Sequence, residues 1–284
     1  MSNLRIGVPS KGRLSEHAME LLSQAGLSFR RQDRSLFARV REMPIDITFL
    51  RTDDIPVLCA EGAIDLGITG SDLVTESEAA VTERMRLGVG KCRLAICVAE
   101  DSPITDPAGL AGKRVATSFP RITHRYLVDH HAAQAHMVSL SGSVEIMIAL
   151  GVADAIVDLV ETGSTLAANR LRVMAEIGKY EAVLIQNPDR REAELADRVV
   201  RRLEGVVIAR AYSLLEYNVP KTKRLEAEAL TPGFNSPTVS ALEDPDWLSI
   251  RAMVAKGDVQ RVMEELEEIG AHAILETVIA NCRL

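Results

Sequence analysis

A short segment that reads as a buried strand followed by a polar turn constrains this 284-residue chain more than any other feature. Residues 155–160 are apolar except for one acid, and the turn Thr162-Gly163-Ser164-Thr165 comes directly after residue 161 and opens a helix. Glycine lets the backbone approach a ligand closely, and the first amides of a helix have no acceptor inside the helix. The turn is therefore expected to hold a phosphate group, with its hydroxyls as additional donors.

Two acids accompany this turn, Asp158 inside the strand and Glu161 at its end. Carboxylates accept hydrogen bonds from sugar hydroxyls, but they repel a phosphate unless the ligand also carries a diol or brings a divalent cation. A phosphorylated ribose carries both a phosphate and a diol. The order of apolar strand, acids and Thr-Gly-x-Thr resembles the phosphoribosyl-pyrophosphate signature of phosphoribosyltransferases. From this motif alone, an ordinary strand–turn–helix with a threonine cap remains the alternative.

An imperfect copy of the same pattern lies earlier in the chain. Residues 62–73 and 151–166 both read as Gly-x-x-Asp, an apolar strand, and Thr-Gly-Ser at the start of a helix. The two copies lie about 90 residues apart. Two copies are too few for a repeat array. They predict two similar α/β lobes that present matching turns to one cleft.

Composition limits the class of protein. The chain is 47 % apolar and 26 % charged, and its length favours two or three domains. A net charge of −7 argues against general nucleic-acid binding. No run approaches the roughly 20 apolar residues of a membrane span. Four cysteines without CxxC spacing, Cys59, Cys92, Cys97 and Cys282, indicate buried thiols in a reducing compartment, so a cytoplasmic location is expected.

Basic residues follow the first predicted strand, residues 4–9. In open α/β sheets, ligands bind just outside the carboxyl ends of the strands, so Lys11 and Arg13 are expected to meet an anionic ligand. Arg51 precedes a predicted helix that runs to about residue 61. Surface charges on ordinary loops are the alternative for Lys11 and Arg13.

The order of predicted elements indicates an α/β protein of three parts. Residues 88–92 read as a crossover between lobes, and the chain then builds a second lobe and returns to the first. This path resembles the periplasmic-binding-protein architecture. We expect catalytic lobe I to comprise residues 1–91 and 180–205, with a helix over about 188–204, and lobe II, which contains the phosphoribosyl-phosphate turn, to comprise residues 92–179.

The last segment, residues 206–284, has a different pattern. It predicts a ferredoxin-like α/β domain, which on fold analogy has a regulatory or assembly role. The expected strands are residues 206–218, 223–230, 238–242 and 273–279, with a helix over 258–269 and either a helix or a strand over 247–254.

Taken together, these motifs resemble the ATP phosphoribosyltransferase family, in its long, histidine-regulated form. The resemblance covers essentially the whole chain. The motifs that carry it occur in the family's order, at residues 11–14, 51–56, 67–72, 142–145, 154–166, 231–233 and 236–238.

The resemblance implies a reaction in which N1 of ATP joins C1 of phosphoribosyl pyrophosphate and pyrophosphate leaves with Mg²⁺, in the first step of histidine biosynthesis. No preformed metal site is expected, because Mg²⁺ would arrive on the pyrophosphate. The implied catalytic cations, which would face the pyrophosphate or the ATP phosphates, are Lys11, Arg13 and Arg51. The implied phosphoribosyl contacts are Asp158, Glu161, Thr162, Gly163, Ser164 and Thr165, and the implied ATP contacts are Gly70, Ser71, Asp72 and Glu145.

The resemblance also implies feedback inhibition by L-histidine, bound between the C-terminal domains of neighbouring subunits. Inhibition would favour a homohexamer over an active dimer. Ser236, Thr238 and Ala273 are the implied histidine contacts. No nucleic-acid or membrane partner is expected.

Two other functions are compatible with the same motifs. A two-lobed small-molecule sensor without catalytic activity would use the same cleft and phosphate turn. A phosphoribosyltransferase that acts on a base other than ATP would share the turn, and only the resemblance of residues 51–56 and of the C-terminal domain favours ATP.

Overall fold

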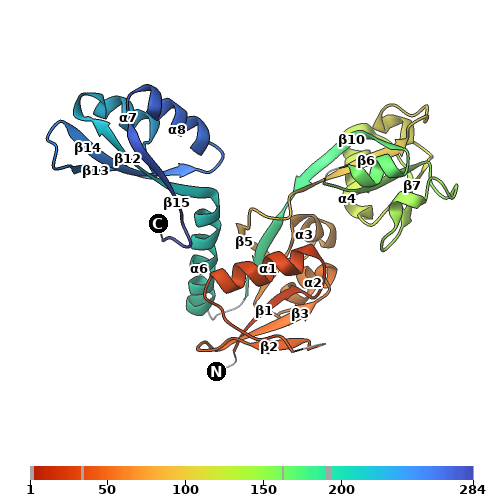
Figure 1. Cartoon of the computed structure of the whole chain (residues 1–284). Helices are drawn as coiled ribbons and strands as arrows, with labels where there is room; N and C mark the ends of the chain where they lie inside the picture. Colours follow the sequence, from red (N-terminus) through yellow and green to blue (C-terminus); the bar gives the residue numbers. More distant parts are fainter. Residues whose placement is uncertain (1–2, 33–34, 162, 190–192, 284) are drawn as a thin grey trace. The chain divides into compact units, whose positions relative to one another are not determined.

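The computed structural model describes residues 3–32, 35–161, 163–189 and 193–283. The chain forms two compact units (Figure 1). The first unit comprises residues 1–19 and 28–196, and the second comprises residues 20–27 and 197–284. Among the described residues, no helix is long and apolar enough to cross a membrane.

The first sheet of the first unit has the strand order β2-β3-β1-β4-β11-β5. Strand β1 lies parallel to both β3 and β4, so the carboxyl ends of these three strands share one edge of the sheet. The segments that follow these strands carry all three predicted cations, Lys11, Arg13 and Arg51, and the turn at residues 69–72. The elements are β1 (Leu4–Pro9), α1 (Arg13–Gln24), β2 (Phe37–Arg39), β3 (Ile45–Leu50), η1 (Thr52–Asp54), α2 (Ile55–Ala60), β4 (Leu66–Gly70), α3 (Ser71–Ser77), β5 (Thr82–Arg86) and β11 (Ala182–Gln186).

The second sheet of the first unit has the order β10-β6-β9-β7-β8. Its core packs around Leu94, Ile96, Val115 and Val157, which are fully buried. The elements are β6 (Cys92–Ala99), η2 (Pro107–Leu110), β7 (Arg114–Thr117), α4 (Pro120–His131), β8 (His136–Ser139), η3 (Val144–Ile146), β9 (Ala155–Val160), α5 (Ser164–Ala168) and β10 (Leu171–Tyr180).

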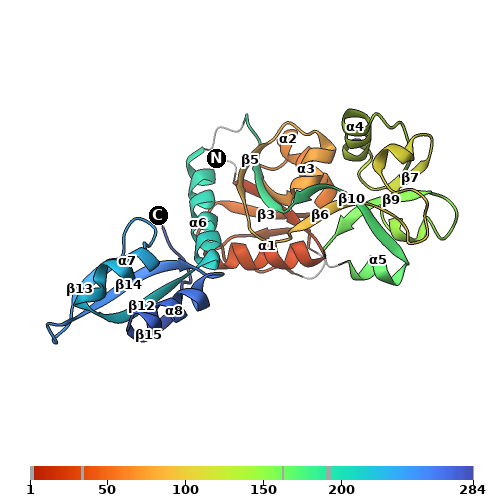
Figure 2. The same ribbon diagram turned by 90° about the horizontal axis from the view of Figure 1, so that it is seen from above.

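The chain passes twice between these two sheets, through residues 87–91 and through Glu181. The two crossovers are hydrogen-bonded to each other, because the amide of Ala182 donates to the carbonyl of Val89 at 3.0 Å. A second connection joins α3 to α4, which lie side by side (Figure 2). The Glu76 carboxylate accepts the backbone N–H groups of Arg121 and Ile122 at 2.9 and 3.0 Å. The two sheets of the first unit are therefore connected at two places, the crossovers and the contact of α3 with α4.

The second unit contains a four-stranded antiparallel sheet of order β13-β14-β12-β15. Helices α7 and α8 cover one face (Figure 1), where alternate residues of β12, such as Leu215, Tyr217 and Val219, are fully buried. The elements are α6 (Ala193–Ala211), which begins in the first unit, β12 (Tyr212–Pro220), η4 (Lys221–Lys223), α7 (Arg224–Leu230), β13 (Thr238–Ala241), β14 (Trp247–Ala255), α8 (Val259–Glu268) and β15 (His272–Val278).

Two of the sequence predictions for this unit are wrong. The predicted strand at residues 223–230 is helix α7, in which Arg224 and Glu228 pair at 2.7 Å one turn apart. The strand predicted from residue 206 begins only at residue 212, because α6 continues to residue 211. In α7, residues of high helix propensity prevailed over the apolar alternation. Over residues 206–211 three β-branched residues favour a strand, and the helix continues because its i, i+3 face, Leu203, Val206 and Ala209, is buried.

Candidate active site

The turn after β9 is open to solvent on the side of its polar groups. Gly163 has φ = 80°, a left-handed conformation that glycine adopts without strain, and it leads into α5. A Cβ at this position would meet no atom within 4 Å. Ser164 and Thr165 are exposed, whereas Leu166 is buried and anchors the turn. Thr162, the fourth predicted residue of the turn, lies outside the described residues.

This turn lines a cavity of about 420 Å³ that also contains Glu145 and Asp158. Burial raises the pKa of Asp158, the amide of Leu159 lowers it, and the nearby charge of Glu145 raises it further. The two carboxylates therefore act on each other across the cavity. A cationic group on a ligand, or a bound divalent ion, would relieve this repulsion.

Arg13, at the start of α1, also lines this cavity. Its guanidinium donates to both oxygens of Glu161, with distances of 2.8 Å from Nη2 to Oε1 and 2.7 Å from Nη1 to Oε2. This bidentate pair joins the first sheet to the turn after β9. Two residues that were expected to contact different parts of a ligand therefore contact each other here.

The matching turn after β4 is closed by its own side chains. The carboxylate of Asp72 lies over Gly70, where a Cβ would overlap Oδ1. Asp72 is 5 % exposed, and burial raises the pKa of its carboxyl, while the amides of Leu73 and Asp72 lower it. Ser71 accepts the amide N–H of Glu181 at 3.2 Å. Gly70 and Asp72 line a second cavity of about 370 Å³, which shares Arg13, Leu159 and Glu161 with the first.

Lys11 and Arg51 follow the neighbouring parallel strands β1 and β3. The amide of Ser10 donates to the carbonyl of Leu50 at 2.7 Å, which holds the two segments side by side. Both cations are exposed, and neither pairs with a carboxylate among the described residues. They line neither of these two cavities, so the structure places them at the edge of the site rather than inside it.

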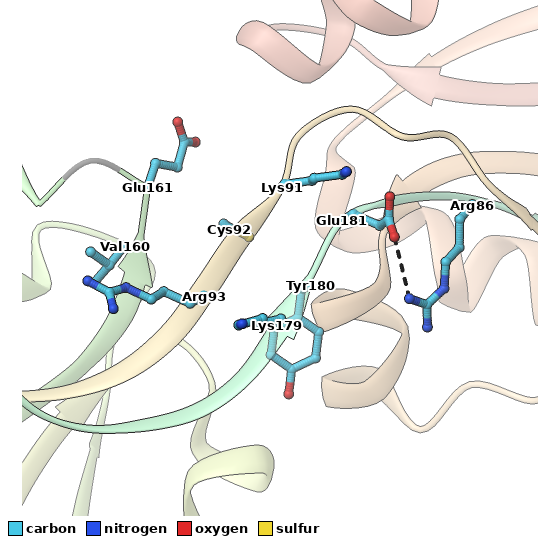
Figure 3. Close-up of a pocket in the computed structure, with 9 residues that line it drawn as sticks. All are labelled: Arg86, Lys91, Cys92, Arg93, Val160, Glu161, Lys179, Tyr180 and Glu181. Carbon is cyan, nitrogen blue, oxygen red and sulfur yellow. Dashed lines mark hydrogen bonds and ion pairs between the residues drawn. The ribbon is translucent and has the colours of Figure 1, made fainter. Parts of the chain in front are cut away.

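A third cavity, of about 430 Å³, surrounds the crossovers (Figure 3). Its lining includes Lys91, Arg93, Lys179 and Tyr180, none of which the sequence patterns singled out as site residues. The crossover at residues 88–92 was recognisable, and the base of a two-lobed cleft is formed by such crossovers. This signal could have identified Lys91, but not the residues of β10.

Within the described part of the chain, no group of three or more histidine, cysteine, aspartate or glutamate side chains is placed to hold a metal ion. Cys92 lines the second and third cavities, and burial raises the pKa of its thiol to about 11, so this thiol is neutral near pH 7.

The candidate histidine contacts lie in the second unit. Thr238 begins β13 and Ala273 lies in β15, and these strands form opposite edges of the sheet. Two strands separate them, which corresponds to roughly 14 Å at the usual strand spacing. Ser236, in the loop before β13, is exposed. Within one chain these residues do not surround a common small ligand.

The chain is similar in sequence to proteins of one known family. Residues 51–205 match the family model described as ATP phosphoribosyltransferase, and residues 209–281 match the model described as HisG, C-terminal domain. The chain is 66 % identical to an ATP phosphoribosyltransferase of Rhodopirellula baltica, over 100 % of this chain and 94 % of that protein.

The chain is also similar to solved structures, of which two are informative. The ATP phosphoribosyl transferase (HisG:HisZ) complex from Thermotoga maritima matches with a TM-score of 0.64 and 29 % identity, over 72 % of this chain and 98 % of that one. The arginine-, lysine-, histidine-binding protein ArtJ from Geobacillus stearothermophilus matches with a TM-score of 0.50 and 13 % identity, over 73 % and 90 %.

The structural matches confirm the predicted α/β fold class, with a periplasmic-binding-protein-like core. The second family model confirms the C-terminal domain of the long form. From the identity over its full length and the match to both family models, the chain belongs to the ATP phosphoribosyltransferase family.

Proposed function

We propose that this enzyme joins N1 of ATP to C1 of phosphoribosyl pyrophosphate, releasing pyrophosphate and forming phosphoribosyl-ATP, the first step of histidine biosynthesis. The observation that supports this proposal best is the junction of two unlike cavities. One has an open phosphate turn, and the other has a buried carboxylate, and the two share Arg13, Leu159 and Glu161. Such a junction suits two substrates that must meet end to end.

The open turn would hold the 5′-phosphate of the phosphoribosyl group through Thr162, Gly163, Ser164 and Thr165. Asp158 would accept hydrogen bonds from the ribose hydroxyls, since it lines the same cavity. Glu161 would contact the ribose after exchanging its pairing with Arg13 for the ligand. In this arrangement residues 92–179 would act as one lobe, and residues 1–91 with 180–205 as the other.

The leaving pyrophosphate would face Lys11, Arg13 and Arg51. The transition state has oxocarbenium character, so the protein needs no nucleophile of its own and acts by alignment and by stabilising the departing charge. Mg²⁺, carried by the pyrophosphate, would supply further charge neutralisation. Glu145 and Asp158 are the carboxylates available to hold it, because their mutual repulsion favours a divalent cation between them.

The adenine would enter the second cavity, next to Gly70, Ser71 and Asp72, while Glu145 lines the first cavity. N1 of adenine attacks with its own lone pair, so no general base is needed to activate it. Positive charge develops on the ring as the N1–C1 bond forms. The buried carboxylate of Asp72 would stabilise that charge and accept a hydrogen bond from the exocyclic amine.

Histidine would inhibit from the second unit, through Ser236, Thr238 and Ala273. These residues lie at opposite edges of one sheet, so we propose that the ligand site needs edges from two subunits. Binding of histidine would then favour the larger oligomer, the hexamer, over the dimer, and the inhibition would be allosteric because histidine resembles neither substrate.

An initial-rate assay tests this function. Purified chain is incubated with ATP, phosphoribosyl pyrophosphate and Mg²⁺, and phosphoribosyl-ATP is quantified with and without L-histidine. Turnover that histidine suppresses without competing against phosphoribosyl pyrophosphate supports both proposals. Turnover that ignores histidine rejects the regulatory one alone. Turnover with another purine nucleotide but not with ATP would overturn the choice of acceptor, and binding without turnover would favour the sensor.

A further inference from the structure

The third cavity collects positive charge in a chain that is acidic as a whole. Its lining includes Arg86, Lys91, Arg93 and Lys179, against two carboxylates, Glu161 and Glu181 (Figure 3). Both carboxylates are already engaged: Glu161 pairs with Arg13 at 2.7 Å, and Glu181 pairs with Arg86 at 3.4 Å. The pocket therefore keeps an excess of cations after its own acids have been paired.

The two lysines are the unpaired members of this set. Arg86 has a second partner in Glu83 at 3.5 Å, and Arg93 contacts Glu176 at 3.7 Å. Neither Lys91 nor Lys179 forms an ion pair with any described residue.

The strand register places two cations in direct opposition. Lys179 of β10 is the cross-strand partner of Arg93 of β6, and in an antiparallel pair such side chains stand on the same face. Figure 3 shows both extending to the same side of the two strands. Like charges in this position destabilise a sheet unless an anion lies between them. Glu176 already offsets part of the charge of Arg93, so Lys179 is the uncompensated cation of this pair, and with Lys91 it points to a ligand that carries more than one negative charge.

The pocket is continuous with the cavity proposed for adenine. Lys91, Cys92 and Glu161 line both, so Lys91 stands at their junction, and Arg93 and Lys179 lie beyond it. A nucleotide with its base beside Asp72 could extend its phosphates past Lys91 towards Lys179. Two polyanions must be bound in one cleft, and separate groups of cations reduce the repulsion between them.

We propose that this hinge pocket, defined by Lys91, Arg93 and Lys179, binds the triphosphate of ATP and leaves Lys11, Arg13 and Arg51 to the pyrophosphate. The proposal rests on the proposed function and refines it. Lys91 would contact the phosphate nearest the ribose, and Lys179 with Arg93 would contact the outer phosphates.

Binding of a nucleotide series tests the proposal. The affinities of ATP, ADP and AMP are measured by calorimetry, with Mg²⁺ and without phosphoribosyl pyrophosphate, for the wild type, Lys91→Gln, Lys179→Gln and the surface control Lys113→Gln. We expect wild-type affinity to rise with each added phosphate. Lys179→Gln should weaken the binding of ATP about tenfold and leave the binding of AMP unchanged, whereas Lys91→Gln should weaken the binding of all three nucleotides. Lys113→Gln should match the wild type.

Several results would overturn the pocket assignment. These are an unchanged series in both variants, or an equal loss for ATP and AMP in Lys179→Gln. In a separate titration with phosphoribosyl pyrophosphate alone, a selective loss of its binding in the variants would assign the pocket to that substrate. The wild-type rate assay separates this failure from that of the function itself. If the wild type forms phosphoribosyl-ATP while the series stays unchanged, only the pocket assignment is rejected, and if it forms none, the proposed function fails.

Discussion

The two strand–turn–helix segments, residues 62–73 and 151–166, share one scaffold. In each, the aspartate of Gly-x-x-Asp accepts the backbone N–H of an arginine in the neighbouring parallel strand, and the guanidinium of that arginine donates to the carbonyl of the glycine. The two sets are Arg5 with Asp65 (2.6 Å) and Gly62 (3.1 Å), and Arg114 with Asp154 (2.9 Å) and Gly151 (3.0 Å). The similarity in sequence is thus a structural repeat up to the strand.

The segments differ at the turn. Gly70 has an extended backbone with φ = −84°, and the carboxylate of Asp72 lies over it, whereas Gly163 has φ = 80° and open space above it. Thr165 stands where the first turn has Asp72. The closed turn supplies its own anion, and the open turn leaves that place to a ligand. The two turns therefore differ both in the backbone of the glycine and in the residue two positions after it, Asp72 or Thr165.

The largest effect is expected from turning the open turn into a closed one. In Thr165→Asp, a carboxylate would occupy the place of the 5′-phosphate and repel it. We expect kcat/KM for phosphoribosyl pyrophosphate to fall about a thousandfold, since placing like charges together costs several kcal/mol. Steady-state kinetics with phosphoribosyl pyrophosphate as the varied substrate measures this.

Thr165→Asn is the matched control, because it has the same shape without the charge. In this variant, kcat/KM for phosphoribosyl pyrophosphate should fall about tenfold, because only the hydroxyl is lost. Equal losses in the two variants would show that shape rather than charge matters, and would contradict the reading of Asp72 as a built-in anion.

The next effect concerns the closed turn. Asp72→Asn keeps the shape of the side chain and removes its charge, so it should lower kcat/KM for ATP about thirtyfold and leave that for phosphoribosyl pyrophosphate nearly unchanged when ATP is saturating. A loss shared equally by both substrates would place Asp72 in the scaffold and not at the adenine.

The same variant should gain stability. Burial raises the pKa of Asp72 in the folded state, so between its ordinary value and this raised value the folded protein binds more protons than the unfolded chain. Stability therefore falls as pH rises through that interval, and the loss is complete above it. Asp72→Asn removes this loss. Its melting temperature should exceed that of the wild type at neutral pH and converge with it in acid.

Alanine at the two turn glycines should distinguish strain from collision. At Gly163 the Cβ meets open space, so Gly163→Ala carries only the left-handed penalty of roughly 1–2 kcal/mol and should reduce activity about tenfold or less through the phosphate turn. At Gly70 the backbone suits alanine, but the Cβ would displace the Asp72 carboxylate. Gly70→Ala should therefore raise KM for ATP selectively. Substrate profiles that are the same in both variants would contradict the division of labour between the turns.

Sequence patterns predicted the open turn because all of its determinants are local: a strand, a glycine and hydroxyls within a few residues. They predicted the closed turn as an equivalent ligand contact, because nothing local shows that Asp72 folds back over Gly70. In helix α7, Leu225 is 79 % exposed although it fits an alternating strand pattern. Alternation there was incidental, and local ion pairs with alanine-rich composition decided for helix.

The hinge pocket was only partly predictable: the crossover at residues 88–92 could have pointed to Lys91, but no sequence pattern pointed to Lys179. Lys91 and Lys179 are far apart in sequence and meet one cavity only because β6 pairs with β10. Neither lysine belongs to a motif, and a cation in a crossover, such as Lys91, or on a strand, such as Lys179, has the same sequence signature as a solvated surface residue. The two lysines are recognised as one site only from the pairing register of β6 with β10, which sequence patterns do not provide.

The smallest effect should come from the shared scaffold. Asp154 accepts the amide of Arg114 and lies 3.5 Å from its guanidinium, but its side chain is 35 % exposed, so Asp154→Asn should cost less than about 1 kcal/mol of stability. The amide of Arg114 lowers the pKa of Asp154, with Arg114's charge adding to this, so its contribution is present above the ordinary pKa and lost as pH falls through the lowered one. Thermal melts of wild type and variant should therefore differ at neutral pH and coincide in strong acid.

Asp65→Asn, at the equivalent but buried position, should cost about 2 kcal/mol of stability. If Asp154→Asn lost more stability than Asp65→Asn, the two segments would share their geometry but not the energetic role of the aspartate.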